Sequence, residues 1–334
     1  MLRMSRHRPA LLLAAISLAP HAFAQLPAHR LDNGVVQARV SEDAGGRLLS
    51  FSLAGRANFL LVDEAAGNPD AVPDAASGNV PWMGHEVWVG PQNEWWMHQD
   101  VNPGRAEAKA VWPPDPYLSL SKYRLVHRDA SRMELESPAS PVSGVQLRKR
   151  YALVAGRPNS LQLEADATNR SGQLAARDIW FNTRVPPHTW AYVPVAGRGD
   201  IRIEPTAALE VTLEDGLLSL DLPAAGDSPR KGKLFIQPSQ GWLAAFRDNQ
   251  MFLIQFAHQA RTAIHPAQGQ VELYQDIDPG APGKGLLELE VHAPYVELTP
   301  GARMSASERW TILPYDGPHT RAAHSAYLRR QGIL

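Results

Sequence analysis

Short segments in which apolar and polar residues alternate recur through most of the chain, and they constrain the fold more than any other feature. They run from Leu118–Arg124 to Leu298. Leu161–Ala165 and Leu287–Val291 alternate strictly, as half-buried strands do, and turn residues separate the segments. No helical period of useful length occurs before Thr320–Leu334, where we expect a short terminal helix. The sequence therefore predicts an all-β fold with sheets packed face to face.

The first part of the folded chain has the same character. Gly34–Val40, Gly45–Leu53 and Phe59–Val62 have the pattern of three short strands joined by turns. Glu64–Val80 is poor in large apolar residues and rich in Asp, Asn, Pro, Ala and Gly, so we expect a surface loop there. No linker or fixed-period repeat divides the sequence, and we predict one domain over residues 25–334.

Residues 1–24 have the features of a secretory signal peptide. Three arginines within the first eight residues precede the largely apolar segment Pro9–Pro20, and Ala22–Ala24 fits the small-x-small cleavage pattern. The apolar segment is too short to span a bilayer as a helix, and no later one is long enough. We therefore expect a soluble mature protein that begins at Gln25, is periplasmic or secreted, and does not insert into a membrane.

Charge and composition exclude several classes of function. The formal net charge is −1 at pH 7, so nucleic acid is not an expected partner. The chain has no cysteine, which excludes disulfides, thiol nucleophiles and cysteine-ligated zinc. The spacings His85–His98 and His258–His265 do not match zinc motifs, and no nucleophile elbow, phosphate loop or Rossmann fingerprint occurs. We expect neither a metal nor a cofactor.

Gly84–Trp96 is the stretch that most directly indicates a ligand. With Trp82 just before it, it holds four of the nine tryptophans. The C–H faces of pyranose rings pack on aromatic planes, while an indole N–H still needs a hydrogen-bond acceptor. We predict that this stretch lines one wall of a carbohydrate pocket. Trp88 alternates with valines and is expected in the core, whereas Trp95 and Trp96 are adjacent, so at most one of them faces the ligand.

Polar side chains in the same stretch have the chemistry to hold sugar hydroxyls. His85 follows a glycine and precedes an acid, so it is the leading candidate for an imidazole that contacts the ligand, with Glu86 at the rim. Gln92 and Asn93 can each form paired hydrogen bonds through a planar amide. The alternative for His85 is a loop histidine that bonds to a backbone carbonyl. The alternative for Gln92 and Asn93 is an ordinary Pro-Gln-Asn turn.

Two later segments supply further candidates. Arg184 and His188 flank a Pro-Pro pair, which predicts a rigid loop able to hold polar groups. Glu290 shares a strand face with Glu288 and His292, because residues two apart on a strand point the same way. If that face lines the pocket, Glu290 is the strongest candidate for a general base. If it faces solvent, the row has no role in the site.

Motifs at the two ends of the chain carry a family resemblance. The first is Gly45–Phe51 (Gly-Gly-Arg-Leu-Leu-Ser-Phe), and the second combines Glu288–Pro294, the Leu-Thr-Pro-Gly turn at Leu298–Gly301 and Glu308–Trp310. In this order the chain resembles the galactose mutarotase-like (aldose 1-epimerase-like) superfamily, and Gly84–Gln92 looks most like an uncharacterised bacterial branch of it. The resemblance implies a large antiparallel β-supersandwich with a sugar site on the concave sheet.

The resemblance also implies a chemistry. In a mutarotase a carboxylate takes the proton from the anomeric hydroxyl while a protonated histidine gives one to the ring oxygen. By this resemblance the histidine would be His188, and the carboxylate would be Glu290 or Glu272. His85 lies near the place where mutarotases have another histidine, in a loop early in the chain. Arg47 resembles an arginine that is frequent at this place in the superfamily and would help to bind the sugar.

We therefore predict an exported carbohydrate-binding or carbohydrate-processing protein. One alternative is an isomerase of the aldose 1-epimerase type, and another is a structural or interaction module without catalysis. If His85 or His188 lies within about 6–8 Å of a late-strand glutamate in one pocket, catalysis is favoured, because acid and base must flank one sugar ring. If aromatic and amide groups line the pocket without that pair, binding is favoured.

Overall fold

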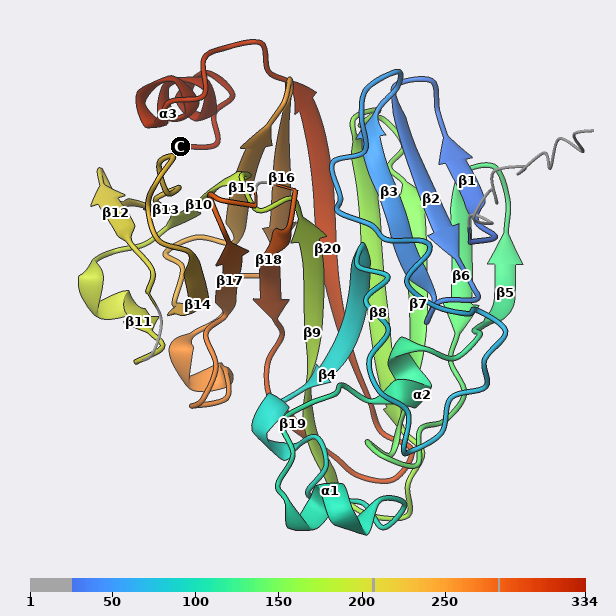
Figure 1. Ribbon diagram of the computed structural model, residues 1–334. Helices are drawn as coiled ribbons and strands as arrows, with labels where there is room; N and C mark the ends of the chain where they lie inside the picture. The colour runs from blue at the N-terminus through green and yellow to red at the C-terminus, as the bar shows by residue number, and fades with distance from the viewer. Residues whose placement is uncertain (1–25, 206–207, 282) are drawn as a thin grey trace, which may run out of the picture.

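The described residues form two antiparallel sheets of ten strands each, packed face to face (Figure 1). The structure, a computed structural model, describes residues 26–205, 208–281 and 283–334. The predicted all-β sandwich is confirmed. The predicted signal peptide, residues 1–24, lies outside the described residues, so export stays a prediction.

The first sheet brings distant parts of the chain together at its centre. Its strands lie in the spatial order β1 (His29–Asp32), β2 (Val36–Ser41), β3 (Arg47–Leu53), β4 (His85–Gly90), β9 (Ala175–Val185), β18 (Gly285–His292), β17 (Val271–Ile277), β14 (Arg230–Ile236) and β11 (Ile201–Ile203), while β19 (Val296–Leu298) pairs with the start of β9.

The second sheet contains the longest strand of the protein, β20. Its spatial order is β12 (Val211–Glu214), β13 (Leu217–Leu220), β10 (Trp190–Pro194), β15 (Trp242–Arg247), β16 (Gln250–Phe256), β20 (Arg303–Pro314), β8 (Ser160–Asn169), β7 (Val145–Leu153), β6 (Arg132–Glu136) and β5 (Arg124–Arg128). The helices of the described residues are short: η1 (Gln92–Glu94), α1 (Pro103–Glu107), α2 (Pro116–Ser119), η2 (Arg198–Asp200), η3 (Arg261–Ala263) and α3 (Arg321–Arg330).

The core lies between the two sheets and is built from alternate residues of each strand. Phe181 and Val185 of β9 belong to the same buried apolar cluster as Trp310 of β20. Trp180 and Arg184 alternate with them along β9 and therefore point to the opposite side of the first sheet. We call this side, away from the second sheet, the pocket face.

Two segments predicted as strands have other structures. Phe59–Val62 forms only an isolated bridge to Met83. Leu118–Arg124 is divided between α2 and the first residue of β5. Here a local helix-start signal outweighs the alternation, because the Asp115 side chain accepts the Tyr117 N–H at 3.0 Å and a proline follows at the first helical position.

The predicted C-terminal helix is present as α3. Its first turn is capped by Thr320, whose hydroxyl accepts the Ala323 N–H at 3.3 Å. Leu328 of α3 is buried in an apolar cluster with Tyr192 and Phe246 on the outer side of the second sheet. None of the helices in the described part of the chain is long and apolar enough to cross a membrane.

Candidate functional site

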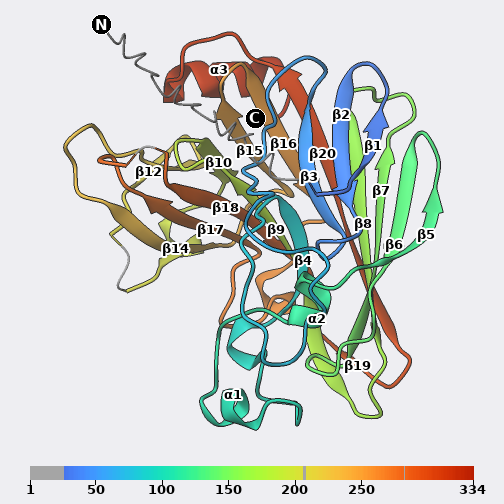
Figure 2. The same ribbon diagram turned by 45° about the vertical axis from the view of Figure 1, so that its right-hand side comes forward.

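A pocket of about 460 Å³ opens on the pocket face, beside the loop that leads into β4. Figure 2 shows the three strands β4, β9 and β18 side by side in the first sheet. Asn79 and Val80, at the end of the predicted loop Glu64–Val80, line the pocket, as does Gln92 of η1. The other lining side chains are mostly aromatic (Trp88, Trp112, Trp180, Phe235 and Tyr274) or charged (Arg47, Glu86, Arg184, Glu204, Lys233 and Glu288).

Strand register arranges the polar groups in rows across the first sheet. In the central row Glu86 of β4 lies opposite Asn182 of β9, and Asn182 lies opposite Glu290 of β18. Glu290 in turn lies opposite Glu272 of β17, which is opposite Phe235 of β14.

Two flanking rows complete this surface. They have the same orientation as the central row because residues two apart on a strand share a face. One row is Arg184, Glu288, Tyr274 and Lys233, and the other is Trp88, Trp180 and His292.

A buried chain of ion pairs forms one side of the pocket. Glu86 accepts hydrogen bonds from Arg47 Nη2 at 2.7 Å and from Arg184 Nη1 at 2.5 Å, and Arg184 Nε donates to Glu288 Oε1 at 2.8 Å. Burial alone would raise the pKa of Glu86, but the two guanidinium groups outweigh it and lower this pKa to about 2. Glu86 is therefore a fixed anion in the wall, and Glu288 keeps its second carboxylate oxygen for a ligand.

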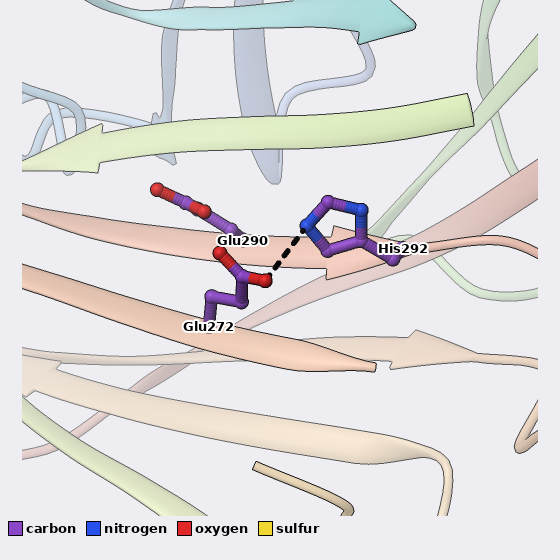
Figure 3. A group of neighbouring side chains, drawn as sticks. All are labelled: Glu272, Glu290 and His292. Atoms are coloured by element: carbon purple, nitrogen blue, oxygen red, sulfur yellow. Dashed lines mark ion pairs between the residues drawn. The ribbon is translucent and has the colours of Figure 1, made fainter. Parts of the chain in front are cut away.

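A second group of charges lies beneath the pocket floor. Lys233, which lines the pocket, donates to Glu272 at 2.7 Å and to Glu290 at 2.8 Å. His292 Nδ1 pairs with Asp178 at 2.7 Å, and its Nε2 lies 3.5 Å from Glu272. Figure 3 shows Glu290 and His292 projecting from β18 and Glu272 from β17. Within this group, Lys233 is the side chain that a ligand in the pocket can touch.

Burial and close partners change the proton affinities in this lower group. Burial raises the pKa of Glu290 to about 8, with Lys233 opposing the rise and Glu288 adding to it. Burial would lower the pKa of His292, but Glu272 and Asp178 outweigh it and raise this pKa to about 9. Burial thus favours the protonated form of Glu290, and the neighbouring carboxylates favour the cationic form of His292.

Tryptophans form the apolar wall of the pocket. Trp88 meets Trp180 edge-on at 4.8 Å between ring centroids, and Trp95 stacks on Trp180 at 5.6 Å. Trp112 meets Trp88 edge-on at 6.3 Å and is 50% exposed. The other three rings are buried, so Trp112 is the part of this wall that presents a broad apolar surface to a ligand.

The structure places four of the predicted ligand-binding residues in the pocket lining. These are Arg47, Glu86, Gln92 and Arg184. Glu290 lies on the pocket face with Glu288 and His292, but it is fully buried below the floor. Trp88 is buried, as expected, but in a cluster of tryptophans and not in the apolar core between the two sheets. It alternates with the core valines and therefore points away from them, to the pocket face, where it also lines the pocket.

Neither predicted histidine lies in the pocket lining. His85 is on the core side of β4, stacked 5.9 Å from Phe181 and hydrogen-bonded to Thr183 at 2.9 Å. Alternation places it on the face opposite to its neighbour Glu86. His188 is exposed in the loop after β9. The acid–base pair that the sequence suggested is therefore not assembled by these two side chains.

The remaining predicted contacts lie beside the pocket. Trp95 and Trp96 are both buried, and their indole N–H groups donate to the carbonyls of Val89 at 2.6 Å and Pro113 at 2.8 Å. Asn93 is exposed on η1. The wall that these residues were predicted to form is supplied by Trp88 together with side chains that come from elsewhere in the chain.

Sequence reasoning missed several residues of the pocket. Trp180, Lys233 and Tyr274 lie in strand-like segments, and Trp112 lies in a loop. Lys233 follows Arg230, Lys231 and Gly232 in β14, so nothing in the local sequence distinguishes it from a solvated strand cation. Local alternation also does not indicate that β17 lies beside β18 and β14 beside β17, because strand order is not readable from it.

Solved structures share the fold over most of the chain. The Slr1438 protein from Synechocystis is 14% identical, with a TM-score of 0.55 over 86% of this chain and 96% of that one. A galactose mutarotase-like protein from Lactobacillus casei is 10% identical, with a TM-score of 0.50 over 86% and 100%. A TPR-domain containing protein from Parabacteroides distasonis is 14% identical, with a TM-score of 0.53 over 88% and 48%. At these identities the likeness concerns the fold alone.

The two supersandwich sheets, with a polar and aromatic pocket on the first, identify a galactose mutarotase-like fold, as the terminal motifs predicted. Within that class, the sequence profile of the family DUF4380, described as a domain of unknown function, matches residues 26–313. The chain therefore belongs to this family. A comparison of the sequence with curated proteins gives no match.

Proposed function

We propose that this protein is exported and binds a carbohydrate in the pocket on its first sheet. One observation carries the proposal: a half-exposed tryptophan, Trp112, lines the same pocket as three charged side chains with free hydrogen-bonding capacity. A sugar ring needs an aromatic surface for its C–H face and planar or charged groups for its hydroxyls. The galactose mutarotase-like protein of Lactobacillus casei shares the fold, which is consistent with a sugar ligand.

The charged groups divide into donors and acceptors. Arg184 uses Nε and Nη1 for Glu288 and Glu86, which leaves Nη2 for a ligand. Lys233 donates two hydrogen bonds to carboxylates, and an ammonium group has three donors. Glu288 supplies an acceptor, and Gln92 adds an amide at the side of the pocket. The pocket volume of about 460 Å³ lies within the usual range for small-molecule sites.

An isomerase of the aldose 1-epimerase type is the second candidate. It is favoured by Lys233 and Glu288, a proton donor and a carboxylate that line the same pocket from one cross-strand row. In such a reaction Glu288 would take the proton of the anomeric hydroxyl, and the Lys233 ammonium group would give a proton to the ring oxygen as the ring C–O bond breaks, because these two side chains line the pocket. Binding remains the better supported function, since the lining among the described residues includes no histidine.

A glycan-array screen of residues 25–334 tests the proposal, followed by calorimetric titration of the best glycan. Trp112→Ala should weaken binding about 5- to 150-fold, since loss of a stacking aromatic typically costs about 1–3 kcal/mol. Leu174→Ala is a matched control, because Leu174 is 56% exposed and does not line the pocket. Equal effects of the two substitutions, or no binding to any glycan, would refute the proposal.

Catalysis has its own measurement. Exchange between sugar anomers can be followed by NMR with the bound sugar in excess, with and without the protein. Acceleration that disappears in Glu288→Gln supports the epimerase candidate. Exchange no faster than in buffer removes it for that sugar and leaves the binding proposal intact.

A further inference from the structure

The buried group Glu272, Glu290 and His292 offers one ligand atom from each side chain, and these atoms lie within 4.8 Å of one another. The three residues come from two neighbouring strands, β17 and β18, and point to the same side (Figure 3). From these contacts we propose that this group binds one divalent transition-metal ion, of the Zn²⁺ or Mn²⁺ class, beneath the pocket floor. The proposal does not depend on whether the pocket binds a sugar.

Two atoms of the group lack hydrogen-bond partners among the described residues. They are Glu290 Oε1 and His292 Nε2, and both side chains are completely buried. A buried polar atom without a partner is costly, so such atoms are normally satisfied by protein, water or an ion. Together with the carboxylate of Glu272, these two atoms form a ligand set of one nitrogen and two oxygens, which suits Zn²⁺ and Mn²⁺.

The supporting contacts have the form that metal sites use. Histidine ligands usually donate their second ring N–H to a carboxylate, which fixes the tautomer with the other nitrogen free for the metal. His292 Nδ1 makes this bond to Asp178 at 2.7 Å. Glu272 Oε1 is held by the Gly269 N–H at 3.0 Å. Lys233 contacts the Oε2 atoms of both glutamates, so it steadies them from the other side.

Distances and charge agree with one ion. Ligand atoms around an ion with bonds of about 2.0–2.2 Å lie about 3–3.5 Å apart. The His292–Glu272 separation of 3.5 Å already has this value, and the Glu290 ligand atom lies within 4.8 Å of the other two. Metal ligands must be deprotonated, so Glu290 and His292 would release their protons when the ion binds. Three buried carboxylates (Asp178, Glu272 and Glu290) would then face one ammonium group, Lys233. A divalent cation would neutralise the two excess negative charges.

The sequence could not indicate this group. Searches for metal motifs rely on short spacings along one segment, and these ligands are divided between two strands. Asn182, the cross-strand neighbour of Glu290, has an unpartnered amide oxygen on the same face and is a further candidate ligand. Three protein ligands leave a coordination position open, as in catalytic rather than structural sites.

The test is calorimetric titration of the chelator-treated full chain with ZnCl₂ and, separately, MnCl₂. We expect one ion per chain. His292→Gln and the isosteric Glu290→Gln should each weaken binding by at least about 100-fold, and Asp178→Asn by about 10–100-fold, as for other residues that orient a ligand histidine. Circular dichroism establishes that each variant is folded. X-ray absorption should give a first shell of nitrogen and oxygen at about 2.0–2.2 Å.

Surface histidines need a matched control. Glu94 lies 3.6 Å from His98 and 3.7 Å from His265, so these partly exposed side chains could bind zinc adventitiously. The double variant His98→Gln/His265→Gln should bind the ion as the wild type does. The proposal is overturned if neither ion binds, if binding is lost in this double variant, or if folded Glu290→Gln and His292→Gln bind normally.

Discussion

Glu86 holds two buried guanidinium groups at once, so removing its charge should destabilise the fold. Glu86→Gln keeps the size of the side chain but leaves Arg47 and Arg184 without their shared anion. The lowering of its pKa from 4.5 to about 2 corresponds to roughly 3 kcal/mol of stability at pH 7, because one pKa unit is worth about 1.4 kcal/mol. Breaking a buried ion pair from one side costs a similar amount, about 3–5 kcal/mol.

The pH dependence of this effect has a definite sign. The folded pKa of Glu86 lies below its unfolded value, so the stabilisation is complete at neutral pH and is lost as the pH falls below 4.5 towards 2. The free energy of unfolding of wild type and Glu86→Gln should therefore differ by about 3 kcal/mol at pH 7, and by roughly 1 kcal/mol less at pH 3.5.

Urea denaturation at pH 7 and pH 3.5, followed by tryptophan fluorescence, measures both quantities. Glu164→Gln is the matched control, because Glu164 pairs with Arg150 at 2.7 Å but its side chain is 42% exposed. An exposed pair contributes less than about 1 kcal/mol, so this variant should change little. A loss below about 1 kcal/mol in Glu86→Gln, or a loss that is the same at both pH values, would contradict the reasoning.

Three further stability predictions concern buried groups elsewhere. Burial lowers the pKa of Lys149 to about 7. Between pH 7 and pH 10.5 the amine has lost its proton in the folded state but not in the unfolded state, so wild-type stability rises with pH. Lys149→Met should therefore be more stable than the wild type at pH 6, and this advantage should shrink by about 2–3 kcal/mol by pH 9. Burial raises the pKa of Glu308 to about 8, so wild-type stability falls as the pH rises from 4.5 to 8. Glu308→Gln should therefore be more stable than the wild type by about 2–3 kcal/mol at pH 7, with no such advantage at pH 4.5. At Gly45, φ is +70° and an added Cβ would lie 2.3 Å from the Ser119 carbonyl oxygen, so Gly45→Ala should lose about 2 kcal/mol or more of unfolding free energy. Gly55 also has a positive φ, but open space surrounds it, so Gly55→Ala should lose only about 1 kcal/mol. Thermal unfolding across this pH range measures all four variants, and pH-independent differences for Lys149→Met or Glu308→Gln would count against the assigned burial effects.

Alternation along a strand was sufficient to predict which residues share a face. Glu288, Glu290 and His292 were expected on one side of a late strand, and the structure places all three on the pocket face of β18. The same rule applied to β4 separates His85 from Glu86, but it does not say which of the two faces the core. Burial between Phe181 and Trp310 decides this for His85, and both partners belong to other strands.

The order of strands in the sheet was not predictable from local sequence. Lys233 and Glu272 reach the site because β14 and β17 follow β18 in the first sheet. Pairing of segments so far apart in the chain depends on the packing of the whole sandwich and leaves no spacing that a motif search can recognise. Trp112 was missed for a different reason, since it lies in a loop whose position depends on its contacts with Trp88 and Trp95.

A crystal structure of the protein with its best glycan from the array tests the proposed function most directly. We expect a sugar ring packed against Trp112, with hydroxyls hydrogen-bonded to Glu288 and to Arg184 or Lys233. A glycan bound on another surface, with the pocket free of it, would contradict the proposed function.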